Sequence, residues 1–325
     1  MQKTYSVFKK YIPIILLTSS LSLIFGMLTF LYYFDEPTMT INIKNVIPIF
    51  TIMLIVIAFS FVCIFTGKVK RFTLTKLKKT FGFSKFAALL AATLAAASFF
   101  FDFFRFVDQP ATFSAFRIIR LLIFIPFIAY FIINVIPKKI KRKKIILPVW
   151  LKPFAAIGTL IWCVLGLVMI YFWSAPVTDP ELSTINIFKL AFIFQYILVT
   201  LFFAFEIKFE LLSPVPKAYI FFAGTLFVYS FTIIGSIMLT TIWSDSNNLS
   251  GISLFEIFLA FALGLYALSK LIAMQRTMKF VMSKHSGETV RHHHHHSSKS
   301  ADNTKDDSKS NDTAKQNSKS KSNKK

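Results

Sequence analysis

The residues best suited to chemistry lie in one short stretch, "FFFDFFRFVDQPATFSAFRIIRLL". It places Asp102, Arg105 and Asp108 before a predicted turn, and Arg117 and Arg120 after it. Residues three apart share a helix face, so Asp102 can pair with Arg105, whereas Arg117 and Arg120 need a partner or an anion between them. Guanidinium groups suit carboxylate or phosphate. The stretch predicts either an anion- or lipid-binding site or a structural charge cluster whose arginines reach the membrane interface.

A sixth candidate, Glu256, follows from self-similarity in the chain. The segment "SAFRI" at 114–118 aligns with "SLFEI" at 253–257, which sets Glu256 opposite Arg117. Equivalent positions predict equal depth in the membrane and, if the two helices meet, an ion pair between these residues. Arg117 has closer acids in Asp102 and Asp108, so this second pairing stays open. Four other charges in or beside apolar runs are predicted to lie at the membrane interface: Lys189, Lys270, and the pair Glu206 and Glu210, which flanks Lys208.

Enzyme chemistry finds little support in the sequence. There is no HExxH, GxSxG, P-loop or paired-cysteine motif, and an intramembrane enzyme would have to use Asp102 or Glu256 as its acid or base. All six histidines lie near the C-terminus, and the run at 292–296 is interpreted as low-complexity sequence or a tag in preference to a metal site. Cys63 and Cys163 are expected to be buried packing residues. We therefore predict no catalytic residue, no cofactor and no metal.

Long apolar runs must position these charges. The chain has 325 residues, of which 55% are hydrophobic and 40 are Phe, and its mean hydropathy is +0.61. A helix needs roughly 20 apolar residues to cross the hydrocarbon core. Eight runs are continuously apolar and lack the alternation of polar and apolar residues that the strands of a membrane barrel show. The sequence predicts an all-α integral membrane protein with eight transmembrane helices at about residues 12–34, 46–66, 86–107, 115–137, 153–174, 186–206, 218–242 and 253–274.

The two halves of the chain resemble each other. Residues 40–61 and 184–205 share nine identities in 22 positions, including Thr40 with Thr184 and Asn42 with Asn186. Just upstream, Asp35 matches Asp179 in the same register. A repeated unit with an even number of spans keeps its orientation in the membrane. We therefore predict two parallel four-helix repeats, at 12–137 and 153–274.

The distribution of charge predicts the orientation. The formal charge is +22, but the basic residues gather in the segments between spans two and three and between spans four and five, with seven in each. By the positive-inside rule these segments face the cytoplasm, together with the N-terminus at 1–11, the linker at 138–152 and the polar tail at 275–325. The tail is expected to be disordered because it has too little apolar surface to bury. The basic loops are predicted to contact anionic lipids, and no nucleic acid is expected.

The sequence favours a non-catalytic membrane subunit, scaffold or sensor of the cytoplasmic membrane, in which a protein partner is possible. The alternative is a transporter or permease for an anionic solute or a lipid headgroup. A transporter needs polar groups near the membrane midplane. The predicted span centres are almost entirely apolar, which favours the first interpretation.

Overall fold

The computed structural model describes most of the chain, in ranges separated by short gaps. Residues 1–282 form one compact unit and residues 283–325 a second. Outside the described residues lie the basic segment at 67–81, seven of the fifteen residues of the predicted linker at 138–152, and the tail at 298–325. The described ranges are 2–35, 40–66, 82–110, 114–136, 139–140, 143–144, 148, 150–172, 178–179, 184–212, 217–243 and 253–297.

Eight helical segments in these ranges are long and apolar enough to cross a membrane, which confirms the predicted class and supports a multi-pass membrane protein. The second span continues from α2 into a π-helix, η1, and the seventh consists of α7, the π-helix η3 and α8. The elements are α1 (Gln2–Tyr33), α2 (Ile43–Phe61), η1 (Val62–Thr66), α3 (Gly82–Asp108), α4 (Ala115–Val135), α5 (Leu151–Tyr171), α6 (Ile187–Leu212), α7 (Lys217–Tyr229), η3 (Ser230–Ile234), α8 (Gly235–Trp243) and α9 (Leu254–Ser297).

A small antiparallel sheet, which the sequence analysis did not predict, joins the two halves. Its strands are β1 (Phe34–Asp35), β2 (Thr40–Asn42), β5 (Thr178–Asp179) and β6 (Thr184–Asn186), in the order β1-β2-β6-β5. The repeated Thr-Ile-Asn segments pair with each other, with Ile41 opposite Ile185 at the centre. Each outer strand pairs in the same register at the offset of 144 residues. We call the end of the bundle that carries this sheet the sheet end. A second hairpin joins β3 (Lys139–Ile140) and β4 (Lys143–Lys144).

The repeated asparagine has a local structural reason. The side chain of Asn42 accepts a hydrogen bond of 3.0 Å from the backbone N–H of Lys44, at the start of α2. Asn186 accepts one of 2.9 Å from the N–H of Lys189, at the start of α6. Asparagine is a favoured residue at this position because its oxygen satisfies a backbone donor that the first helical turn leaves open. The same strand-to-helix transition therefore occurs twice.

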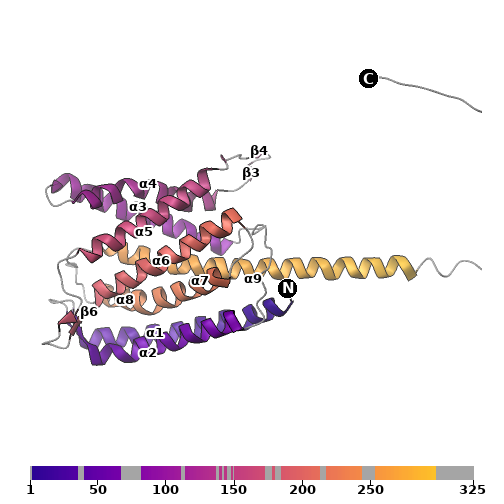
Figure 1. Ribbon diagram of the computed structural model, residues 1–325, viewed down its shortest axis with the longest axis horizontal. Coiled ribbons are helices and arrows are strands. Elements are labelled where there is room, and N and C mark those ends of the chain that lie inside the picture. Colours follow the sequence, from indigo (N-terminus) through magenta and orange to yellow (C-terminus); the bar gives the residue numbers. More distant parts are fainter. Residues whose placement is uncertain are drawn as a thin grey trace, which may run out of the picture. The chain divides into compact units, whose positions relative to one another are not determined.

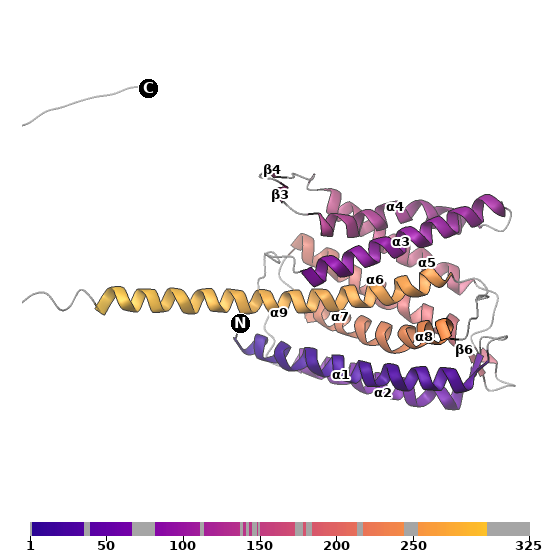
Figure 2. The ribbon, with the colours of Figure 1, turned by 180° about the vertical axis from the view of Figure 1, so that it is seen from behind.

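The helices form layers within residues 1–282. The pair α1 and α2 lies on one side of the bundle and the pair α3 and α4 on the other, with α5, α6, the seventh span and α9 between them (Figure 1; Figure 2). The seventh and eighth spans are the most enclosed, since 83% and 78% of the residues in an apolar 18-residue stretch of each are buried. Each half's first helix packs on the next one, α1 on α2 and α5 on α6, but α1 also packs on the seventh span whereas α5 also packs on α4. Helix neighbours thus differ between the halves.

The last helix extends beyond the predicted start of the tail. The sequence analysis began the disordered tail at residue 275, but α9 runs to Ser297 and buries Met274, Thr277 and Met278. These residues repeat at helical spacing and continue the apolar face of the span, which is why the boundary prediction was wrong.

Candidate functional site

A buried arginine forms the centre of a charge cluster near the sheet end. Arg120 lies in the second turn of α4 and is only 5% exposed. Ser114 caps this helix by accepting a hydrogen bond of 3.4 Å from the backbone N–H of Arg117. Glu256 lies in the first turn of α9, and Tyr196 lies within α6. Three helices far apart in the sequence therefore bring these side chains together.

Arg120, Tyr196 and Glu256 form a closed triangle of interactions, which we call the Arg120 cluster. The Nη2 atom of Arg120 lies 2.6 Å from Oε1 of Glu256 and donates a hydrogen bond of 2.5 Å to the hydroxyl of Tyr196. The Tyr196 hydroxyl in turn donates to Glu256. Charge-assisted hydrogen bonds of this kind are stronger than neutral ones. The cluster therefore fixes the start of α9 against α4 and α6.

Aromatic rings and one glycine support the Arg120 cluster. The guanidinium carbon of Arg120 lies 4.5 Å from the ring centroid of Trp162 on α5, within the range of a cation–π interaction. Gly166 lets Tyr196 approach α5, because a Cβ at this position would lie 2.7 Å from Cε1 of the Tyr196 ring. The Nη1 atom of Arg120 has only the sulfur of Met169, at 3.9 Å, as a partner among the described residues.

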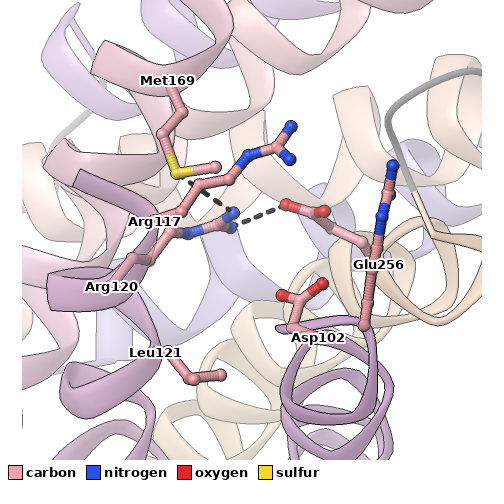
Figure 3. A pocket seen from close by; sticks show the side chains of 7 residues that line it. Asp102, Arg117, Arg120, Leu121, Met169 and Glu256 are labelled. Carbon is pink, nitrogen blue, oxygen red and sulfur yellow. Dashed lines mark hydrogen bonds and ion pairs between the residues drawn. The ribbon is translucent and has the colours of Figure 1, made fainter. Parts of the chain in front are cut away.

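A small cavity opens beside the Arg120 cluster (Figure 3). Its volume is about 30 Å³, and it is lined by the charged residues Asp102, Arg105, Arg117, Arg120 and Glu256, together with Leu121 and Met169. Since about 10–15 Å³ suffices for one water molecule, roughly two would fit. Figure 3 shows Arg120 extending toward Glu256 between Met169 and Asp102. Three guanidinium groups and two carboxylates thus meet around one space.

The structure brings five of the six predicted site residues together around this cavity. The sixth, Asp108, is exposed at the end of α3 and is not among the lining residues. Arg117 and Glu256 line the same cavity, but the ion pair that Glu256 forms is with Arg120, one helical turn beyond Arg117. The sequence suggests only Arg117 as the partner of Glu256, because the alignment relates positions along the chain and does not show which face of α4 turns toward α9.

Comparison with protein-family models, with curated proteins and with solved structures gives no match to this chain. The side chains of the cavity are therefore the basis for a functional assignment. Among the described residues, no group of three side chains is placed to hold a metal ion. The described lining offers no serine, cysteine, histidine or lysine nucleophile. The described lining consists of charged donors and acceptors beside two apolar side chains, Leu121 and Met169.

A second buried cluster lies farther along the same helices. We call Glu206, Lys270, Tyr130 and Tyr219 the Glu206 cluster. Glu206 is fully buried, and its Oε1 lies 2.7 Å from Nζ of Lys270 and accepts a hydrogen bond of 2.9 Å from Tyr130. Tyr219 donates to the other carboxylate oxygen. Both clusters use α4, α6 and α9, and Tyr130 lies ten residues after Arg120, which is about 15 Å along a helix.

Glu206 and Lys270 do not point outward to water, as snorkelling charges at a membrane interface would. Both side chains are enclosed by protein, because two tyrosines and the opposite charge replace the water that each would otherwise need. Lys189 is also buried, whereas Lys208 is exposed, and nothing is described of the side chain of Glu210. A usable signal was present in the sequence: an acid and a base inside two predicted spans mark polar partners within the bundle.

Proposed function

We propose that this chain is a non-catalytic multi-pass protein of the cytoplasmic membrane, acting as a membrane subunit, scaffold or sensor that recognises an anionic group in its charged cavity. The observation that carries the proposal is the convergence of Arg105, Arg117 and Arg120 around one space whose described lining contains two carboxylates, those of Asp102 and Glu256. Guanidinium groups present several donors in a fixed geometry that matches anionic oxygens. The surplus of positive charge favours an anion as the occupant.

The packing between the two clusters supports recognition without passage. The rings of Phe127 and Trp162 stack with centroids 4.2 Å apart, and those of Phe203 and Tyr266 stack at 6.4 Å. These four side chains are all buried or nearly so and fill the space between α4, α5, α6 and α9. Close packing of this kind leaves no room for a hydrated solute.

A transporter or permease for an anionic solute or a lipid headgroup is the second candidate. It is supported by polar groups inside the enclosed seventh span, where Ser230 donates a hydrogen bond of 3.0 Å to Gln195. Ser230 begins the π-helix η3, and π-helical turns often occur at functional sites. An intramembrane enzyme using Asp102 or Glu256 is the least favoured class, because no catalytic motif accompanies these acids.

Reconstitution separates the two candidates. Purified protein in liposomes should bind anions without moving labelled phosphate, sulfate or chloride across the membrane. Mass spectrometry of the purified sample should find a co-isolating protein or an anionic lipid. Anion flux that disappears in an Arg120→Gln variant would contradict the non-transporting role and favour the permease.

We further propose that both termini and the basic loops face the cytoplasm, which places the sheet end outside. Two positions that lie outside the described residues test this orientation in a background without Cys63 and Cys163. A cysteine at Ser246 should react with an impermeant reagent added to intact cells, and a cysteine at Lys141 should react only after lysis. The reverse pattern would contradict the orientation. The basic loops would then lie against the anionic lipids of the inner leaflet.

The proposed internal repeat is supported most directly by the sheet. The symmetric register around Ile41 and Ile185, and the equivalent asparagine caps, are expected of a duplicated helix–hairpin–helix segment. We propose that two four-helix units were duplicated and that their symmetry persists at these hairpins, while the helix neighbours have diverged. We also propose that the polar tail at 298–325 is disordered.

A further inference from the structure

We propose that the cavity beside the Arg120 cluster binds the phosphate of a phosphodiester. This inference rests on the proposed function and names the class of anion. The ligand would be either the headgroup phosphate of a phospholipid or a soluble diester, since both carry the same two non-bridging oxygens.

The charges around the cavity match an anion with a single negative charge. Among the described residues, three arginines and two acids line it, so this part of the lining carries one net positive charge when all five are ionised. A phosphodiester carries one negative charge at neutral pH, shared by two oxygens. A doubly charged anion would leave excess negative charge beside Asp102 and Glu256 in an environment that screens charge poorly.

Unused donors at the cavity point to oxygen atoms. Arg120 is buried, and its Nε has no hydrogen-bond partner among the described residues. An unpaired buried donor is costly, so native structures almost always satisfy such groups with protein, water or ligand. Within the described part of the chain, the guanidinium of Arg105 also forms no hydrogen bond or ion pair, although it lines the cavity. Nη2 of Arg120 is already engaged by Glu256 and Tyr196.

The size of the cavity and its surroundings fit a diester. A volume of about 30 Å³ accommodates roughly two water-sized atoms, which corresponds to the two non-bridging oxygens. The two ester substituents would then have to leave the cavity. Phe101 and Phe255 directly precede Asp102 and Glu256, are 43% and 40% exposed, and have ring centroids 6.1 Å apart. Neither ring is among the residues that line the cavity, but each is next in sequence to a lining acid, so the pair offers an exposed apolar surface for the acyl-bearing substituent of a lipid.

Binding to the delipidated full-length protein in detergent tests the inference. The probes are phosphatidylglycerol, dimethyl phosphate, diacylglycerol and acetate. Wild-type protein should bind both phosphodiesters more tightly than acetate and should show no saturable diacylglycerol site. The double variant Arg105→Gln/Arg117→Gln should bind the diesters about tenfold to a hundredfold more weakly, because each lost guanidinium removes charge-assisted hydrogen bonds. The control Lys279→Gln, at an exposed position of α9, should bind them like the wild type.

The outcomes are distinct. Binding of phosphatidylglycerol alone identifies a lipid source, and binding of dimethyl phosphate as well admits a soluble one. Acetate binding equal to that of the diester, with the same dependence on the arginines, overturns the phosphodiester and leaves the anion-recognition role intact. Anion binding that does not depend on these arginines, or no anion binding, overturns both.

A measurement on the wild-type protein keeps the test valid if the double variant does not fold. Phenylglyoxal modifies accessible arginines, and peptide mapping identifies the modified positions. Dimethyl phosphate or phosphatidylglycerol should protect Arg105 and Arg117 but not Arg276, which is exposed on α9. Equal modification with and without the diester would overturn the proposal.

Discussion

The substitution Lys270→Met should destabilise the protein strongly, because it leaves the carboxylate of Glu206 charged and without its counter-ion in the bundle. Glu206 is fully buried and lies 2.7 Å from Lys270, and only Tyr130 and Tyr219 would remain as donors among its described partners. Removing one partner of a buried ion pair costs about 3–5 kcal/mol. For a unit of this size, each kcal/mol of lost stability lowers the midpoint of thermal unfolding by about 2–4 °C, so the midpoint should fall by about 6–20 °C.

The assay is the loss of the monodisperse size-exclusion peak after heating in detergent. The control is Lys279→Met, a change of the same type at an exposed position of α9, which should shift the midpoint little. The double variant Glu206→Gln/Lys270→Met should recover most of the loss, since the amide oxygen of glutamine accepts from one tyrosine, its NH2 group donates to the hydroxyl of the other, and no charge remains buried. If Lys270→Met behaves like Lys279→Met, or if the double variant is no better than the single one, the coupling of these two charges is refuted.

Two further predictions concern packing and register. Gly166→Ala should lower the free energy of unfolding by about 1–3 kcal/mol, and hence the midpoint in the same heating assay, because its Cβ would lie 2.7 Å from the Tyr196 ring. The control Gly82→Ala, with no atom within 4 Å of the new Cβ, should change the midpoint little. Equal losses for both variants would contradict the close contact. In a background without native cysteines, Ile41→Cys/Ile185→Cys should form a disulfide on oxidation, because the two residues are paired across β2 and β6. The control Ile41→Cys/Thr178→Cys should form none, since Thr178 lies one strand farther away. Cross-linking of the control pair alone would show a different strand order.

The sequence predicted the class of fold well because the dominant signal is simple. Eight continuous apolar runs leave few alternatives to membrane-spanning helices. The small sheet was missed, although its central residues had been singled out as a repeat. Strands of two or three residues, such as the one that ends at Asn42, carry no alternation pattern of their own, and only the pairing with the other half makes them strands.

The charged cavity was partly predictable, because four of the residues that line it are near one another in the sequence. Asp102, Arg105, Arg117 and Arg120 are close in sequence on two helices joined by a short turn, so proximity followed from topology. Tyr196 comes from a helix that no local pattern connects to this turn. Its role depends on the packing of α6 against α4 and α5, which a single sequence does not encode in any periodicity.

The Glu206 cluster shows the limit of interpreting charges one at a time. Glu206 and Lys270 each lie near the predicted end of a span, so each alone is explained by contact with water. Together they form a buried pair, because Tyr130 and Tyr219 complete the set of hydrogen bonds. The rotation of α4, α6, α7 and α9 about their own axes decides whether these side chains face one another or face water.

The most direct test of the proposed anion site is an experimental structure of the wild-type protein in nanodiscs containing phosphatidylglycerol. We expect density for a phosphate between Arg105, Arg117 and Arg120, with an oxygen within hydrogen-bonding distance of the Arg120 Nε. The contradicting result is a cavity that holds only water, with Arg105 and Arg117 turned away to the acids Asp102 and Asp108.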